Sequence, residues 1–506
     1  MTALPERKTP RQRTGRWRIT AVAVGVAAVA LLSKPEPPPV PPAGAGQPIF
    51  EWRQDALWSQ LEARLVASRA LDAAALTAQI DPALARLRSL VEQLAARPHG
   101  PADDLFGQLE SQLFHLGPLI AAHPARLNEY IEAVTRARSA VKDQSRAWDL
   151  GTLPARQRLY RLLYGSRLAL ETVLLQVPPD TPLTELVRGD DEPSVTPSAT
   201  LLGIKLHSGD ILVSRGAAPT SSLIARGNDY PGAFSHVALV HVDPSTHEVL
   251  LVEALIERGV VVTTLDEYLE GKKLRVMLLR PRADLPALVA DPMRPHQAAA
   301  SALAAARRRH IPYDFAMDHH DPRAQFCSEV ASAAYASVGI SLWMGVSYVS
   351  SPTLTAWLGS IGVRHFETQE PADLEYDPQL RLVAEWRGRT TLFNAHVDDA
   401  ATDVFIEQAP PGAPLPYSHA QLPLARLAKG YSALLNTLGR TGPIPQGLSA
   451  TAALRVERYR EDHQALVGRL LARAEEFRKE RGYLPPYWEL VRLAREIRQG
   501  PAVAKP

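Results

Sequence analysis

The sequence predicts an α+β protein in which a small antiparallel sheet packs against helices. Residues 236–242 alternate between two faces, residues 243–246 have the composition of a turn, and residues 249–253 resemble a returning strand. An apolar run over residues 330–335 is typical of a helix. Far upstream, residues 84–94 carry leucine and valine at steps of three and four, the spacing of an amphipathic helix. Paired strands and long helical segments therefore occur in one chain.

Proline-rich stretches divide the 506 residues into segments, and a chain of this length should hold roughly two to four domains. The N-terminal flank shows helical spacing without an acid–base or metal motif, so we expect a structural or partner-binding role for it. The C-terminal helical segments, 454–481 and 488–498, carry Arg and Glu between their apolar residues, and we expect these charges to form a solvated face rather than a membrane or nucleic-acid patch. Asp81 and Pro82 predict the start of the helix over 84–94. The predicted organisation is a basic tail (1–18), an apolar segment (19–33), a proline-rich linker (34–49), a helical region (50–176), a linker (177–199), a mixed domain (200–395), a linker (396–420) and a helical C-terminal region (421–506).

The N-terminus has the pattern of a membrane segment. The first eighteen residues hold six basic side chains against one acidic one, and residues 19–32 contain no charge. This pattern is typical of a secretory signal peptide or an uncleaved signal anchor. No small-x-small cleavage site follows directly, so an anchor with its basic end in the cytoplasm is favoured. We expect a single-pass protein of the inner (cytoplasmic) membrane, with the bulk of the chain in the periplasm or outside the cell. A basic tail before a buried helix is the alternative.

Charge and cysteine content restrict the partners. The formal net charge is only +2, which makes no general case for nucleic acid. Cys327 is the only cysteine, so no internal disulfide can form, and a single thiol is compatible with export. We expect no cofactor and no resident metal.

Cys327 opens the helix-like run and is a candidate nucleophile. Backbone N–H groups and the positive end of the helix dipole at such a position favour the thiolate. His236 lies about ninety residues upstream in a strand-like run. A cysteine with a distant histidine is the usual constellation for a thiol nucleophile and its general base. A buried, inert cysteine is the alternative.

Glu253 is the candidate third member of this site. If residues 240 and 251 pair in the hairpin, His236 lies diagonally across from Glu253 on one face. The carboxylate would then hold the imidazole in the correct tautomer. A one-residue slip in register would turn Glu253 to the other face, where it would be an ordinary strand glutamate.

Five short motifs follow one another along residues 200–390. They are Gly209-Asp210-Ile211-Leu212-Val213, Ser235-His236-Val237, Val252-Glu253-Ala254, Pro312-Tyr313-Asp314-Phe315 and Phe326-Cys327-Ser328-Glu329. Together they resemble the signature of permuted papain-like amidases, the YaeF/YiiX-type relatives of NlpC-like cysteine peptidases and of lecithin:retinol acyltransferases. The resemblance implies a circularly permuted papain-like domain, with a Cys–His catalytic pair and an antiparallel sheet packed on the cysteine helix. It also implies hydrolysis or transfer at an amide or ester carbonyl.

Tyr313 and Asp314 belong to one of these motifs and precede the cysteine closely. The resemblance makes them candidate substrate-binding residues that line the cleft, while capping and packing of the preceding loop is the alternative. We expect Asp210 to begin a strand and to bond local backbone, without a chemical role.

A rival constellation lies just before the cysteine. Its nitrogen and oxygen ligand types suit a metal ion, although their spacing fits no metal motif. Its members are His310, Asp314, Asp318, His319, His320 and Asp321.

The sequence thus predicts a thiol-dependent hydrolase of the cell envelope, an amidase or peptidase, that acts through an acyl-enzyme. Its substrate would be a peptide amide, such as one in the cell wall, or a lipid acyl group, and its helical regions could bind protein partners. A metal-dependent hydrolase and a non-catalytic envelope scaffold are the alternatives.

Overall fold

The structure is a computed structural model that describes residues 34, 46, 50, 55–178, 181, 183 and 185–500. The predicted basic tail and apolar segment (1–33) lie outside the described residues. Within the part of the chain that is described, none of the helices combines the length and the apolar character needed to cross a bilayer. The predicted membrane segment therefore stays a prediction.

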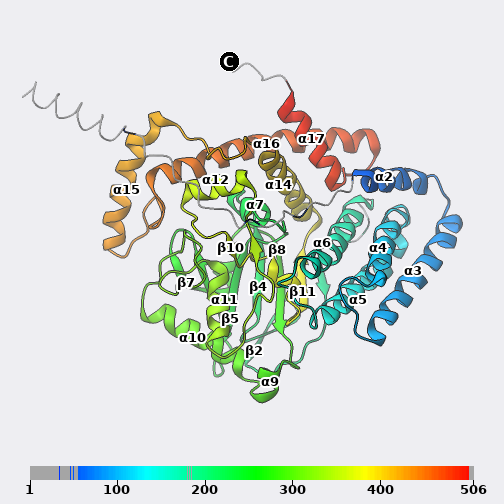
Figure 1. The fold of residues 1–506 in the computed structure, drawn as a ribbon, viewed down its shortest axis with the longest axis horizontal. Coiled ribbons are helices and arrows are strands. Elements are labelled where there is room, and N and C mark those ends of the chain that lie inside the picture. Colours follow the sequence, from blue (N-terminus) through cyan, green and yellow to red (C-terminus); the bar gives the residue numbers. More distant parts are fainter. Residues whose placement is uncertain are drawn as a thin grey trace, which may run out of the picture.

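The N-terminal region is a bundle of helices with one continuous apolar core (Figure 1). Asp72 caps the second of these helices by accepting a hydrogen bond from Ala75 N–H at 2.8 Å. The predicted start at Asp81 and Pro82 is therefore wrong, since Pro82 lies inside this helix. The elements are α2 (Asp55–Arg69), α3 (Ala73–Ala96), α4 (Asp104–Ala122), a short 3-10 turn (Pro124–Arg126), α5 (Leu127–Ser145) and α6 (Leu153–Gln176).

An antiparallel sheet of seven described strands forms the centre of the molecule, in the order β1-β11-β8-β4-β5-β6-β7. Two strand pairs, β2-β3 and β9-β10, stand beside it. The strands are β1 (Leu186–Arg188), β2 (Ser198–Leu201), β3 (Ile204–His207), β4 (Ile211–Gly216), β5 (His236–Val242), β6 (Val249–Leu255), β7 (Gly259–Thr264), β8 (Lys273–Pro281), β9 (Ser347–Tyr348), β10 (Glu367–Thr368) and β11 (Leu380–Arg387).

Both faces of the sheet are buried. Apolar side chains alternate between the two faces along a strand, and each face packs into its own core. Val237 and Leu239 of β5 enter the core shared with α10 (Arg294–Arg308) and α11 (Cys327–Ala336). Ala238 and Val240 enter the core on the other face, which the β2-β3 pair and α8 (Leu265–Glu270) help to cover. The mixture of helices and antiparallel sheet agrees with the predicted α+β class.

The remaining helices cover the ends of the sheet and form the C-terminal region (Figure 1). Helix α14 packs against α7, β8, α16 and α17. It occupies residues 396–408, which the sequence analysis assigned to a linker, and β1 likewise falls within the predicted linker 177–199. These helices are α7 (Pro219–Arg226), α9 (Pro286–Ala290), α12 (Pro352–Ile361), α13 (Asp373–Tyr376), α14 (Arg389–Gln408), a 3-10 turn (His419–Gln421), α15 (Leu422–Thr437), α16 (Ala450–Arg481) and α17 (Tyr487–Gln499).

A buried ion-pair network joins α6 to the sheet. Arg167 of α6 donates to Glu385 of β11 at 2.8 Å and to Glu375 at 2.7 Å. Glu171, one turn further along α6, accepts from Arg275 of β8 at 2.6 Å. Removing one member of such a network leaves an unpaired buried charge, which typically destabilises a protein by about 3–5 kcal/mol. The helical bundle is therefore fastened to the domain that carries the cysteine.

Candidate active site

Cys327 is the first residue of α11, as the sequence predicts, and its side chain is buried. The preceding residue, Phe326, has an extended backbone, and its N–H donates to Glu329 Oε2 at 2.7 Å. This bond satisfies an N–H group that the helix itself cannot use. Glu329 therefore determines where α11 begins and places the thiol at the helix terminus.

His236 and Glu253 face each other across the hairpin of β5 and β6. Val240 pairs with Leu251, which is the register the sequence analysis expected. His236 Nε2 lies 2.5 Å from Glu253 Oε2, and Thr263 Oγ1 donates to the other carboxylate oxygen at 2.7 Å. The glutamate is thus held from two sides, and the imidazole is oriented by it.

The imidazole also meets the thiol. Glu253 engages Nε2 of His236, and Cys327 is the other group that acts on this imidazole. Burial by itself would lower the pKa of His236, but its hydrogen bonds to Cys327 and Glu253 outweigh burial and raise the pKa to about 9. Burial likewise opposes ionisation of Glu253, yet the bond to His236 prevails and lowers the pKa of this carboxyl. The imidazole of His236 is therefore held in its charged form at neutral pH.

Two further carboxyl groups lie within electrostatic reach of the thiol. Burial, the largest effect, raises the pKa of Glu329 to about 9, and the charges of Asp314 and Cys327 act in the same direction. Burial also raises the pKa of Glu370 well above its usual range, reinforced by the charges of Asp373 and Cys327. Sequence reasoning did not find Glu370, because nothing in the pattern around it marks an acid that folds back to the cysteine.

Tyr313 is half-buried and lies in the loop before α11, with its ring 5.0 Å from that of Phe315. Burial first, and then the charge at Cys327, raises the pKa of Tyr313 well above its usual range, so its hydroxyl stays neutral. A neutral hydroxyl near the nucleophile suits the predicted substrate-binding role, which stays a prediction.

Asp314 is engaged with its own loop. One of its carboxylate oxygens accepts from Ala316 N–H at 2.8 Å and the other from Asp318 N–H at 2.6 Å. These bonds give Asp314 the capping task that the sequence analysis held as the alternative, while its predicted contact with substrate is untested.

The motif around Gly209 and Asp210 has a structural explanation. Asp210 is buried, accepts from His207 N–H at 2.8 Å, and pairs with Arg280 at 2.8 Å. Gly209 has a φ of +99°, and a Cβ there would lie 2.3 Å from Pro295 Cβ. Only glycine therefore fits beneath α10, and the aspartate anchors the start of β4 as expected.

The structure separates most of the rival His–Asp cluster. His310 Nε2 lies 3.1 Å from Gln446 Oε1, in the segment after α15. Asp321 pairs with Arg323 of its own loop at 2.6 Å. The six residues therefore do not converge on one point.

Two members of that cluster do come together with a residue that the sequence analysis did not include. Ligand atoms of His319, His320 and Glu367 all lie within 4.8 Å of one another. Two imidazoles and one carboxylate are a donor set that suits zinc or a similar divalent cation. The group is partly to fully exposed, so water competes for its ligands.

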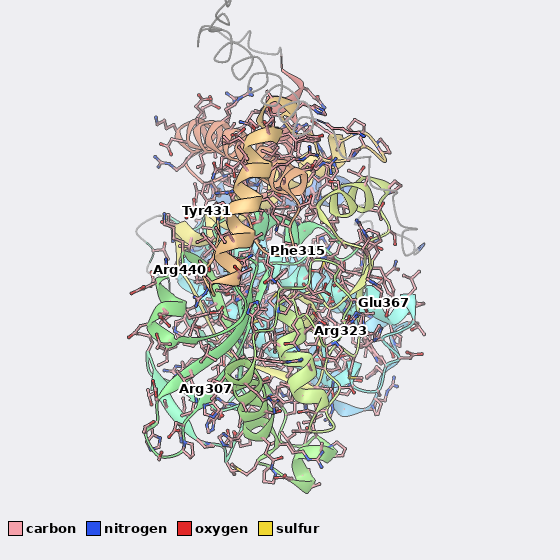
Figure 2. The ribbon with its side chains drawn as sticks, turned by 90° about the vertical axis from the view of Figure 1, so that its left-hand side faces the viewer. Arg307, Phe315, Arg323, Glu367, Tyr431 and Arg440 are labelled. Carbon is pink, nitrogen blue, oxygen red and sulfur yellow. The ribbon has the colours of Figure 1, made fainter. Side chains whose placement is uncertain are left out.

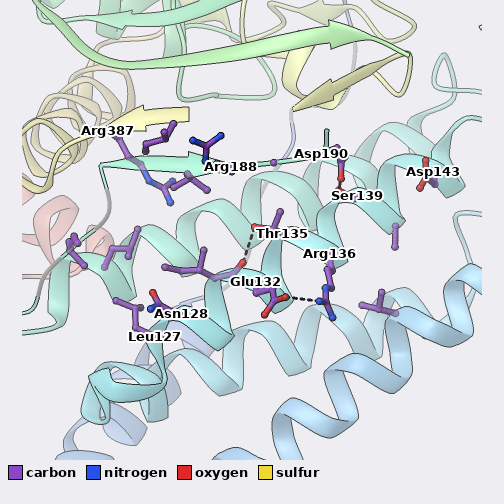
Figure 3. Close-up of a pocket in the computed structure, with 18 of the residues that line it drawn as sticks. Leu127, Asn128, Glu132, Thr135, Arg136, Ser139, Asp143, Arg188, Asp190 and Arg387 are labelled. Atoms are coloured by element: carbon purple, nitrogen blue, oxygen red, sulfur yellow. Dashed lines mark hydrogen bonds and ion pairs between the residues drawn. The ribbon is translucent and has the colours of Figure 1, made fainter. Parts of the chain in front are cut away.

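A cavity of about 710 Å³ lies beside β1, at the edge of the sheet that is remote from the candidate site. Strands β11, β8 and β4 lie between β1 and β5, the strand that carries His236. Helices α3, α5 and α6 form the rest of its wall. Figure 3 shows that polar groups in it pair with one another, Glu132 with Arg136 at 2.5 Å and Ser139 with Asp190 at 3.0 Å. We assign no chemistry to this cavity.

Comparison with known proteins confirms the resemblance that the five motifs indicate. Residues 205–384 match the family described as permuted papain-like amidase enzyme, YaeF/YiiX, C92 family. The crystal structure of metalloprotein yiiX from Escherichia coli O157:H7 matches with 20% sequence identity over 36% of this chain and 98% of its own, at a TM-score of 0.29. No curated protein matches the chain. The family match supports a hydrolase of the cysteine peptidase or amidase type.

Proposed function

We propose that this protein is a thiol-dependent hydrolase that cleaves an amide or ester bond with Cys327 as nucleophile and His236 as general base. One observation carries the proposal. The imidazole of His236 is hydrogen-bonded to Glu253 at 2.5 Å, and Cys327, at the start of α11, joins Glu253 in raising the pKa of this imidazole. The match of residues 205–384 to the permuted papain-like amidases supports the same chemistry.

In the proposed reaction, His236 takes the proton from the Cys327 thiol, and the resulting thiolate attacks the carbonyl carbon of the substrate. Glu253 holds the imidazole and stabilises its charged form. The N–H of Cys327 is the first of its helix, where no helical carbonyl is available to it. That group is the candidate donor to the oxyanion of the tetrahedral intermediate.

The protonated imidazole then donates its proton to the leaving amine or alcohol, and a thioester remains on Cys327. Water resolves the thioester in a hydrolase, and an acceptor amine or hydroxyl would do so in a transferase. We propose a peptide amide or a lipid acyl group in the cell envelope as substrate. This location depends on the basic and apolar pattern of residues 1–33.

The test is the capture of the acyl-enzyme. The full chain would be incubated with p-nitrophenyl acetate, released p-nitrophenol would be followed optically, and peptides would be analysed by mass spectrometry. We expect a burst of product and one acetyl group on Cys327, both absent in Cys327→Ala and His236→Ala. An unmodified Cys327 in a wild-type chain that still turns over the ester would contradict the thiol mechanism.

The group of His319, His320 and Glu367 keeps a metal-dependent reaction as the second candidate. The same assay with a chelator, and with His320→Ala as a variant, separates the two. Loss of turnover both with the chelator and in His320→Ala, while Cys327→Ala keeps its turnover, would favour the metal-dependent reaction. A chain whose thiol reacts with no electrophilic probe would instead favour the scaffold.

A further inference from the structure

Helix α15 presents an apolar stripe to solvent. Its members recur at steps of three and four residues, so they fall on one face of the helix. Each is between 56% and 70% exposed. They are Leu424, Leu427, Tyr431, Leu434 and Leu438.

The inner face of α15 is less apolar than this outer face. Toward the protein the helix buries Leu422, Ala425 and Ser432, and the Ser432 hydroxyl accepts from Ile444 N–H at 2.9 Å. Apart from Leu422 at its first position, α15 buries small side chains and exposes its large apolar ones. Figure 2, in which α15 faces the viewer and Tyr431 is labelled, shows the helix lying on the surface of the molecule. Contiguous exposed apolar surface of this kind marks a contact with a partner or a membrane.

The charge of this region favours an anionic partner. No acidic residue occurs between Glu407 and Glu457, whereas Arg426, Lys429 and Arg440 lie in or just after α15. An apolar stripe bordered by basic side chains is the pattern of a helix that lies in the interface of an anionic bilayer.

The position of α15 relative to the N-terminus points to the same partner. Arg426 Nη2 donates to the backbone oxygen of Lys34 at 2.7 Å. Lys34 follows, after one serine, the uncharged apolar run of residues 19–32 and its basic flank. Lys34, directly after the segment with the composition of a signal anchor, therefore lies against α15.

We propose that α15 binds the surface of an anionic lipid bilayer, with its apolar stripe at the boundary of headgroups and acyl chains and with Arg426 and Arg440 beside the headgroups. Lys429 faces the segment after the helix, where its Nζ donates to the backbone oxygens of Pro445 and Gln446 at 2.8 Å. A second copy of the chain fits less well. The stripe spans about two heptads, fewer than the three or four that sustain a coiled coil. Paired copies would also bring like charges together, because the border of the stripe carries only basic residues.

Bilayer contact at α15 would also orient the candidate active site. The segment after α15 packs on Phe315, since a Cβ at Gly447 would lie 2.4 Å from the Phe315 ring. The ring of Phe315 in turn contacts that of Tyr313, in the loop before Cys327. Phe315, labelled in Figure 2, and Ala428 of α15 pack against the same small core of Ile444, Leu448 and Ala452, which links the loop before Cys327 to this helix.

The test uses the full chain with Cys327→Ala, which removes the native thiol, and a single new cysteine that carries an environment-sensitive fluorophore. Leu434→Cys reports on the stripe. Val289→Cys, on α9, is the matched control, because Val289 is an exposed aliphatic side chain, at 72% exposure, outside the stripe, and α9 lies away from α15 in Figure 1. Both chains would be reconstituted in vesicles of phosphatidylethanolamine and phosphatidylglycerol, and in vesicles of phosphatidylcholine alone.

We expect the label at 434 to shift its emission to the blue and to be quenched by brominated acyl chains in the anionic vesicles, and less so in the neutral ones. The label at 289 should stay open to aqueous iodide throughout. Equal quenching at both positions would overturn the proposal, as would equal behaviour in both kinds of vesicle. Shielding of the 434 label in detergent that grows with protein concentration would assign the stripe to a second copy instead. None of these outcomes depends on the proposed enzymatic activity.

Discussion

The titration of His236 is the most direct test of the site, because it needs no substrate. The pKa of His236 is raised from 6.5 to about 9, against the effect of burial, by its bonds to Cys327 and Glu253. A charge-assisted hydrogen bond contributes about 1.5–3 kcal/mol, and 1.36 kcal/mol corresponds to one pH unit. Glu253→Gln keeps an acceptor but removes the charge. The pKa of His236 should therefore fall by about one to two pH units.

The measurement is the exchange of the imidazole C2 proton for deuterium, followed over a pH series by mass spectrometry of histidine-containing peptides from the full chain. Glu248→Gln is the matched control, because it removes the same charge from the exposed turn of the same hairpin. We expect the control to titrate like the wild type. His236 that still titrates near pH 9 in Glu253→Gln would refute the argument, and so would an equal change in Glu248→Gln.

Three further outcomes are expected. Cys327→Ala and His236→Ala should each abolish nearly all ester turnover without adding to one another, while Glu253→Gln should keep a measurable remainder. The raised pKa of Glu329 means that its contribution to stability is complete below pH 4.5 and is lost as the pH rises toward about 9. In urea unfolding, the free energy of unfolding of Glu329→Gln should therefore rise relative to that of the wild type across this range, by up to about 1.4 kcal/mol per pH unit. A difference between the two proteins that does not change with pH would contradict a buried neutral carboxyl at Glu329. Gly209→Ala should lower the free energy of unfolding by more than about 3 kcal/mol, measured in the same way, because both its φ and Pro295 oppose a side chain.

The hairpin and the cysteine helix could be predicted from the sequence because local patterns determine them. Alternation from His236 to Val242 and the turn at 243–246 favour the register in which Val240 pairs with Leu251, and this register places Glu253 diagonally across from His236 on the same face. The start of α11 at Cys327 follows from Glu329. This glutamate lies three residues after Phe326 and caps the first turn by accepting a hydrogen bond from the Phe326 N–H.

Other features could not be predicted, because they depend on contacts between distant parts of the chain. Pro82 signals a helix start, yet Asp72 offers an earlier cap, and packing against α4 and α5 carries α3 past the proline. The proline-rich stretch after Ala409 suggests a broad linker. Helix α14 nevertheless continues to Gln408, because one of its faces packs on α16 and α17. Glu370 reaches the neighbourhood of Cys327 only through the tertiary fold.

The carboxyl groups near Cys327 differ in charge because their surroundings differ. This difference determines the electrostatic field at the thiol. Glu253 has the imidazole and the Thr263 hydroxyl as partners, so its carboxylate form is stabilised despite burial. Glu329 has a single backbone N–H, and Glu370 has no cation among the groups that shift its pKa, so burial keeps both of them neutral at pH 7. An ionised carboxylate at either position would repel the thiolate. With those two neutral, the Cys327 side chain meets the imidazolium of His236 and the positive end of α11, while the ionised Glu253 is bonded to the imidazole and stabilises its charged form.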